Sequence, residues 1–192
     1  MSIRTRKAIV SAYSEQIRAD YATHQLAEWR SGRWYLKKPD TINLWAEVFT
    51  LRYGGLLVDG DGGSVIFRAS DHTAPARRVA WMASRDSADD RYFVEKASIG
   101  SGGRDRVMRF DSVVAVADLH ELVDEEPDVR GVIDEFNSDS SSAREDMCEA
   151  LSEIGLWEEA GDVGMVPTWA MFHAHAVLQR LHCLLSEKAV AS

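Results

Sequence analysis

The stretch "GLLVDGDGGSVIFR", residues 55–68, joins two short apolar runs through the segment Asp-Gly-Asp-Gly-Gly at 59–63. Leucine and valine precede this segment at 56–58, and valine, isoleucine and phenylalanine follow it at 65–67. Glycine adopts positive φ without steric cost, and aspartate tolerates that region better than most residues do. The stretch therefore predicts an antiparallel hairpin with a tight turn at 59–63.

Three further strands are expected before this hairpin. "HQLAEWRSGRWYLKKPD", residues 24–40, reads as two short strands around Ser31 and Gly32. "TINLWAEVFTLRYGG", residues 41–55, alternates along the chain and places large apolar groups on both faces. Such a pattern is typical of a central strand. The result is a meander of up to five antiparallel strands.

Helical periodicity marks both ends of the chain. Residues 5–27 predict a helix in which Ile9, Tyr13, Ile17 and Tyr21 form one stripe. A final helix begins at Pro167 and Thr168. Its core-facing stripe consists of Met171, Ala174, Leu178, Leu181 and Leu185.

Between the hairpin and the final helix the chain carries several helix-start signals. Pro75 opens one helix, Ser87 and Asp90 are spaced as a capping pair, and Asp111 caps a third helix. Ser142 and Glu145 form an S-x-x-E box. The expected helices are 75–84, 87–97, 111–125, 128–136 and 142–154, with a brief strand in 104–110.

These elements predict an α+β fold, in which a small antiparallel β-meander packs on an N-terminal helix and a helical C-terminal half follows. Residues 1–99 hold the helix, the sheet and a helix pair, and residues 104–192 form an acidic helical region. Both regions are expected within one compact domain, because 192 residues suit one domain.

Composition points to the cytoplasm. The N-terminus lacks the apolar run of a signal peptide, and no stretch approaches the length of a membrane span. The two cysteines, Cys148 and Cys183, fall in predicted helices and make no disulfide framework. A reducing cytoplasm is the natural setting.

The net charge of −9 hides an uneven distribution. Residues 1–110 hold 18 Lys and Arg against 13 Asp and Glu, whereas residues 111–192 hold 4 against 18. Between Asp118 and Asp162 there are 16 acids against Arg130 and Arg144. Such asymmetry marks a partner surface or self-association, and the alternative is a solvated helical face.

The Asp-Gly-Asp-Gly-Gly segment at 59–63 does not match any of three ligand-binding loop patterns. An EF-hand loop starting at Asp59 would need an oxygen ligand at Gly63 and a glutamate at Ser70. A Walker loop needs a lysine, which is absent near this segment, and a dinucleotide loop needs a following helix, whereas a strand is expected here. The segment fits a plain turn, while a metal or ligand contact at Asp59 and Asp61 remains the alternative.

No constellation of catalytic residues emerges. His173 and His175 point to different sides of the final helix, and the HExxH pattern is absent, so these histidines are interpreted as polar-face or boundary residues. Neither cysteine sits in a basic context, and no GxSxG elbow occurs. We expect no catalytic residue, no cofactor and no metal.

Two surfaces are candidates for binding. The first is the acidic face, which would contact a protein partner through Asp118, Glu121, Asp124, Glu125, Glu126, Asp128, Glu145 and Asp146. The second interleaves cations with aromatic rings in "RWYLKKP" and "RDRVMRF" and would contact a nucleotide or nucleic acid. Its residues are Trp34, Lys37, Lys38, Arg104 and Arg106, with Asp59 and Asp61.

The order of segments resembles that of small accessory proteins of tailed bacteriophages and prophages of proteobacteria. The resemblance is carried by "LWAEVFTLRYGGLLVDGDGGSVIFR", by "YFVEKA" and by "PTWAMFHAHAVLQRL". It implies a non-enzymatic protein that binds a host protein or complex, in the manner of an anti-CRISPR-like counter-defence inhibitor. A third hypothesis is head-to-tail self-assembly of the basic and acidic halves.

Overall fold

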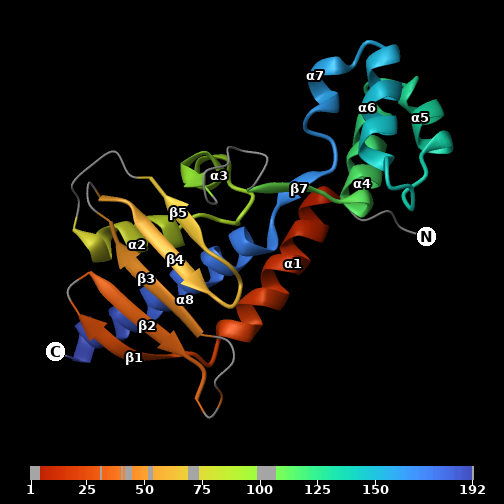
Figure 1. Cartoon of the computed structure of the whole chain (residues 1–192). Helices are drawn as coiled ribbons and strands as arrows, with labels where there is room; N and C mark the ends of the chain where they lie inside the picture. Colours follow the sequence, from red (N-terminus) through yellow and green to blue (C-terminus); the bar gives the residue numbers. More distant parts are fainter. Residues whose placement is uncertain are drawn as a thin grey trace. The chain divides into compact units, whose positions relative to one another are not determined.

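A computed structural model describes residues 5–30, 32–39, 41, 45–51, 54–68, 74–98 and 107–191 (Figure 1). It has an N-terminal helix, a six-stranded antiparallel sheet and a helical C-terminal half, so the predicted α+β class is confirmed. Within these ranges, no helix combines the length and the apolar character needed to cross a bilayer.

The helices and strands follow one another in the order that Figure 1 labels. The helices are α1 (Arg6–Tyr21), α2 (Pro75–Ala83), α3 (Arg91–Lys96), α4 (Ser112–Leu122), α5 (Val129–Glu135), α6 (Ala143–Glu153), α7 (Trp157–Ala160) and α8 (Trp169–Ala191). The strands are β1 (Gln25–Arg30), β2 (Arg33–Lys37), β3 (Trp45–Thr50), β4 (Leu56–Gly60), β5 (Val65–Phe67), β6 (Ala97–Ser98), β7 (Met108–Phe110) and β8 (Met165–Pro167).

The chain divides into two compact units. One unit, here the acidic unit, comprises Met1–Ser11 and Met108–Val166. The other, here the sheet unit, comprises Ala12–Val107 and Pro167–Ser192. The sequence-based division placed the last helix with the acidic segment, whereas α8 belongs with the sheet. The reason is that the apolar stripe of α8 packs against α2, β1, β4 and β5.

The main sheet is a meander with strand order β1-β2-β3-β4-β5-β6, and all its neighbours are antiparallel. The strand expected to be central, β3, lies inside the sheet between β2 and β4. The prediction of up to five strands was one short, because β6 follows α3 and pairs with β5. Its two residues are too few to carry an alternating pattern.

Side chains alternate across the sheet as the pleat requires. The buried face consists of Trp34, Leu36, Ala46, Val48, Leu56, Val58, Val65 and Phe67. The opposite face carries half-buried Tyr35, Trp45, Phe49, Leu57 and Ile66. In Figure 1, α2 and α8 run along one side of the sheet only. The large apolar groups that β3 places on both faces therefore have different roles, since only one face is core.

The predicted hairpin is formed by β4 and β5, which pair Leu56 with Phe67 and Val58 with Val65. Within the turn, Gly63 has φ +100°, a region that favours glycine. Gly62 is required for another reason, because a Cβ atom there would overlap the ring of His173. The turn therefore packs so closely against α8 that position 62 has no room for a side chain.

The helices α1 and α3 each differ from their predicted bounds by four residues or more at one end. α1 ends at Tyr21 rather than at residue 27, because residues from Gln25 onward pair with β2. α3 begins at Arg91 rather than at 87, because Asp90 caps it by accepting the Phe93 N–H. In both cases tertiary pairing or a stronger cap overrides local helical pattern.

The acidic unit packs four helices around its own apolar cluster. That cluster consists of Ala115, Leu119, Val129, Val132, Met147, Leu151, Ala160 and Val163. Asp111 caps α4 as predicted, accepting the N–H groups of Val113 and Val114. The predicted capping box of α6 is wrong, because the hydroxyl of Ser142 donates to Asp146 instead of binding the helix N-terminal backbone.

Candidate functional site

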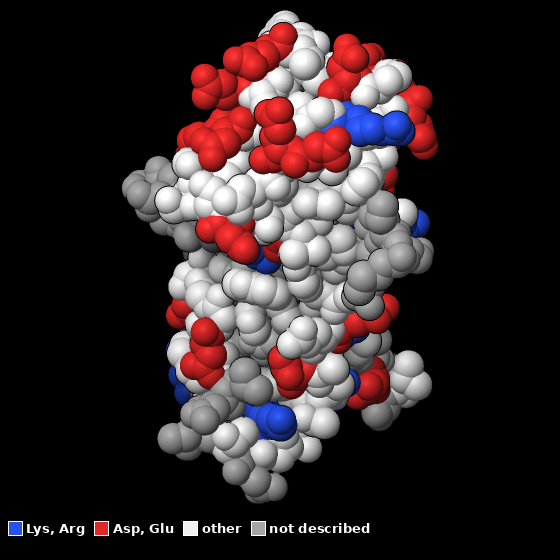
Figure 2. All heavy atoms as spheres, turned by 90° about the vertical axis from the view of Figure 1, so that its right-hand side faces the viewer, with Lys and Arg blue, Asp and Glu red and all other residues white. Residues whose placement is uncertain are grey.

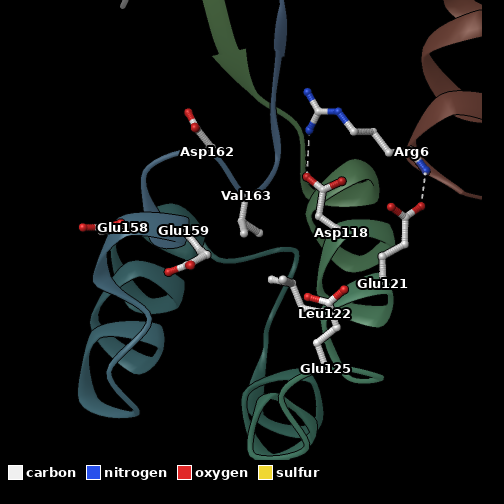
Figure 3. Close-up of a pocket in the computed structure, with 9 residues that line it drawn as sticks. All are labelled: Arg6, Asp118, Glu121, Leu122, Glu125, Glu158, Glu159, Asp162 and Val163. Carbon is white, nitrogen blue, oxygen red and sulfur yellow. Dashed lines mark hydrogen bonds and ion pairs between the residues drawn. The ribbon is translucent and has the colours of Figure 1, made fainter.

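The main candidate site is a groove in the acidic unit. The groove has a volume of about 510 Å³ and lies between α4 and α7 with the segments that follow them (Figure 3). Its walls consist of Arg6, Asp118, Glu121, Leu122, Glu125, Glu158, Glu159, Asp162 and Val163. Six of these residues are carboxylates, so the acidic groove has a strongly negative lining.

Local structure places these carboxylates on two walls. On α4 and the turn after it, Asp118, Glu121 and Glu125 follow one another at spacings of three and four, which is one helix face. The opposite wall begins after Gly155, whose φ of +88° ends α6. The Leu156 N–H then bonds back to the carbonyl of Leu151, and the chain enters α7.

One end of the acidic groove is closed by Arg6. Its guanidinium lies 2.8 Å from Asp118 and also donates to the carbonyl oxygen of Met165. The Arg6 backbone N–H donates to Glu121, and Asp118 accepts the Gly164 N–H at 2.8 Å. Asp118 is therefore a structural member of the wall rather than an open contact.

Burial shapes the protonation of Asp118. Desolvation raises the pKa of this carboxyl above its ordinary value, and this effect outweighs the lowering by the Gly164 N–H and by Arg6. The carboxylate is consequently costly to keep charged, which explains why it holds its cation and amide partners so closely.

The remaining groove carboxylates face solvent. Glu125, Glu158 and Glu159 are exposed, while Leu122 is half-buried and Val163 is buried between the two walls. Figure 2 shows that Asp and Glu gather densely over the part formed by α4 to α7, with little Lys or Arg among them on this face. A long cationic side chain fits such a groove, because its stem packs on Leu122 while its head reaches the carboxylates.

An exposed aromatic ring adjoins these acids in sequence. Trp157 is 67% exposed at the start of α7, directly before Glu158 and Glu159. Ile154, at the end of α6, is exposed as well. Exposed Trp is the residue type most enriched among the energetically dominant contacts of protein interfaces.

The predicted acidic face is only partly collected in the acidic groove. Asp118, Glu121 and Glu125 line it. Other predicted acids are exposed but lie outside the lining: Asp124, Glu126, Asp128, Glu145 and Asp146. The sequence selection missed Glu158, Glu159 and Asp162, although they were included in the charge count. Nothing in their spacing predicts that the chain returns to face α4.

One aromatic member of the predicted aromatic-basic sheet surface is not at the surface. Trp34 is 2% exposed and belongs to the core, because it alternates with Leu36 toward the helix-covered face. Lys37 is exposed and Lys38 is half-buried. The rings on the opposite face are instead Tyr35 and Trp45, with centroids 6.4 Å apart. Arg104 and Arg106 lie outside the described residues.

Asp59 and Asp61 serve the turn. The hydroxyl of Ser64 donates to Asp59, and the Trp45 N–H donates to Asp61 at 3.1 Å. The adjacent hollow is only about 10 Å³, about the space of a single water probe. Among the described residues, no three or more His, Cys, Asp or Glu side chains group in a way that could hold a metal ion. The geometry matches the turn interpretation.

The histidines of α8 are more deeply placed than predicted. His175 is buried, and its Nε2 lies 3.0 Å from the carbonyl oxygen of Arg85, so the boundary interpretation is wrong for it. Burial lowers the pKa of His175 to about 4. His173 Nδ1 lies 3.1 Å from the hydroxyl of Tyr21. Burial lowers the pKa of His173 and raises that of Tyr21 to about 12, so both groups are neutral near pH 7.

Cys148 and Cys183 lie in α6 and α8, in agreement with their predicted helical placement, and neither forms a disulfide. Cys148 is half-buried and donates to the carbonyl oxygen of Ala160, while Cys183 is exposed.

No protein-family model, no curated protein and no solved structure matches this chain.

Proposed function

We propose that this chain is a non-enzymatic binding protein whose acidic groove receives a basic segment of a protein partner. One observation carries the proposal. Carboxylates from two walls, α4 with its following turn and α7 with its following turn, surround Leu122 and Val163. Acids that serve only solubility have no need to converge on an apolar strip.

The chemistry of the acidic groove defines the partner. Glu125, Glu158 and Glu159 are exposed, so they retain their hydration until a cation arrives. A Lys or Arg side chain replaces that hydration with charge-assisted hydrogen bonds and buries its stem. The dense negative charge around the groove also steers a basic partner during encounter.

The resemblance to phage accessory proteins supplies the biological setting of the proposal. The partner is then a protein or protein complex of the bacterial host, met in the cytoplasm. Occupying a basic surface of a defence complex would block it without any chemical reaction, which is the counter-defence role. Binding through charge and shape requires neither a cofactor nor a metal.

The test compares two charge reversals of equal size within the acidic unit. Glu125→Lys/Glu159→Lys alters the groove, whereas Asp134→Lys/Glu135→Lys alters exposed acids of α5 that do not line it. Tagged chains are used to capture proteins from bacterial lysate after nuclease treatment. The partner captured by the wild-type chain is then titrated against each variant by calorimetry.

We expect the groove variant to bind at least about ten-fold more weakly, because each wall loses a carboxylate and gains a repelling cation. The α5 variant retains affinity within about two-fold, since its charges contribute mainly to steering. Equal losses in both variants would sink the groove and leave only a diffuse electrostatic attraction. Unchanged affinity in both would remove the acidic unit from binding altogether.

A further inference from the structure

Four side chains of the sheet unit form a ladder in which two aromatic rings stand between two cations. The guanidinium carbon of Arg85 lies 4.8 Å from the ring centroid of Trp81. The ring centroids of Trp81 and Tyr92 are 4.5 Å apart, and the angle between the ring planes is 89°. The ammonium of Lys96 lies 4.8 Å from the ring centroid of Tyr92. We call this set the cation–aromatic ladder.

The core does not explain the exposure of Trp81. α2 buries Val79, Met82 and Ala83, and this stripe packs the helix on its neighbours. Trp81 points elsewhere and is 41% exposed. Tyr92 is half-buried, whereas its neighbour Phe93 is fully buried.

Hydrogen bonds and ring packing fix the backbone that carries the ladder. The carbonyl oxygen of Arg85 is bound by buried His175, and the hydroxyl of Ser84 donates to the carbonyl oxygen of Trp81. Phe93, the residue after Tyr92 in α3, packs on Phe67 with ring centroids 4.7 Å apart. A ligand that contacts the ladder therefore finds its rings and cations already ordered, which lowers the entropic cost of binding.

Cations flank the rings of the ladder, and carboxylates lie near them in sequence. Arg77 is exposed and precedes Trp81 by four residues on α2, so it lies on the same helix side. The carboxylate of Glu95 is engaged by Arg91 at 2.9 Å, and Asp90 is engaged as the α3 cap. Asp86 is the exposed carboxylate that adjoins Arg85 in sequence, and it limits the attraction for anions in general.

The geometry points to single-stranded nucleic acid as the ligand of the cation–aromatic ladder. A base stacks on the open part of the Trp81 indole, while phosphates contact Arg77, Arg85 and Lys96. Aromatic rings flanked by cations offer both interactions that a single strand provides. A duplex keeps its bases stacked on one another, and an acidic peptide has no flat ring system at each repeat, so neither uses the ring and the cations together.

The predicted properties of this site follow from its residues. Stacking accepts any base because every base has an aromatic face, so binding is tolerant of sequence. DNA and RNA share the base and the phosphate, and only the 2′-hydroxyl separates them. The site belongs to the sheet unit and uses no residue of the acidic groove, so it is independent of the proposed protein partner.

The experiment measures fluorescence anisotropy of labelled oligo-dT and oligo-rU of about 15 nucleotides with the full-length chain at two salt concentrations. We expect binding of at least one of them and poor competition by a duplex of the same length. Trp81→Ala weakens binding by about ten-fold or more, because one stacked base is lost. Lys96→Gln flattens the salt dependence by about one phosphate contact.

Trp157→Ala is the matched control, since it removes a still more exposed tryptophan from the acidic unit. It leaves oligonucleotide affinity unchanged. Equal binding by wild type, Trp81→Ala and Lys96→Gln would overturn the proposal, and so would the absence of any binding. A salt-sensitive oligomer that Trp81→Ala abolishes, without oligonucleotide binding, would likewise overturn it in favour of self-association.

Discussion

The two units differ in how many exposed acids they gather around one groove. In the sheet unit, two carboxylates have partners within the fold: Glu47 pairs with Arg33 at 2.7 Å, and Asp61 accepts the Trp45 N–H. In the acidic unit, Glu125, Glu158 and Glu159 face solvent around the acidic groove. Charge that is neutralised locally builds structure, whereas charge that is concentrated and exposed produces the negative potential on which the proposed binding depends.

The units also build their cores from different patterns. The sheet unit buries alternate residues of its strands against an apolar stripe of α8. The acidic unit closes one face of each of its helices around a cluster of alanine, valine, leucine and methionine. Each unit therefore has its own apolar core, and the comparison can be broken by damaging one core at a time.

The largest effect is expected from deleting one large side chain in each core. Phe93→Ala in the sheet unit removes packing on Phe67 and His175 and costs about 3–5 kcal/mol. Leu151→Ala in the acidic unit costs about 2–5 kcal/mol for the same reason. Urea denaturation measures both losses, and hydrogen exchange shows which amides lose protection.

Separate cores predict separate damage. After Phe93→Ala, faster exchange is expected in β2 to β5, with α4 to α6 nearly unchanged, and Leu151→Ala is expected to reverse this pattern. Uniform loss of protection across the chain after either substitution would show that the two units fold as one cooperative block. The contrast drawn between them would then describe their surfaces only.

A second effect sharpens the comparison through pH. The pKa of His175 is lowered to about 4 in the folded sheet unit, against 6.5 for an unperturbed histidine. The unfolded chain therefore binds a proton before the folded chain does, and stability falls as the pH drops from 6.5 to 4. The loss amounts to about 3 kcal/mol across this window.

Urea titrations at pH 7 and pH 4.5 measure this loss. His175→Gln starts from lower stability but shows a smaller decrease on acidification, because the titrating group is gone. If His175→Gln loses as much stability on acidification as wild type, another group accounts for the acid sensitivity.

The smallest effect distinguishes two helix caps within the acidic unit. Asp111→Ala removes two hydrogen bonds to the α4 backbone and an ion pair with Arg109, and costs about 1 kcal/mol or somewhat more. Ser142→Ala on α6 removes no cap hydrogen bond, so it costs only a few tenths of a kcal/mol. Thermal melts of the two variants side by side measure the difference, and equal shifts would contradict the cap assignment.

Local signals in the sequence were sufficient for much of this fold. Pro75 at the start of α2, Asp111 before α4 and the glycine-rich turn after β4 each act within a few residues, and each lies where predicted. Trp34 shows the limit, because its sequence neighbourhood suggested a surface ring. Only the pairing of β2 with β3 sets which way the alternating side chains point.

The candidate sites depended far more on long-range contacts. The charge count located the acidic unit, but the acidic groove exists only because α7 returns to face α4. The cation–aromatic ladder was missed for a similar reason, since Trp81 and Tyr92 belong to separate helices whose approach no spacing reveals. Each site is a meeting of segments, and a pattern read along the chain contains no distance between them.

The sequence by itself determined the fold class, the meander and the uneven distribution of charge, because periodicity, turn chemistry and charge are local properties that add along the chain. The tertiary structure alone decided that α8 belongs with the sheet, that Trp34 is core and that three acids of the α7 region complete a groove. These outcomes follow from how apolar faces are buried together, which is a property of the whole chain.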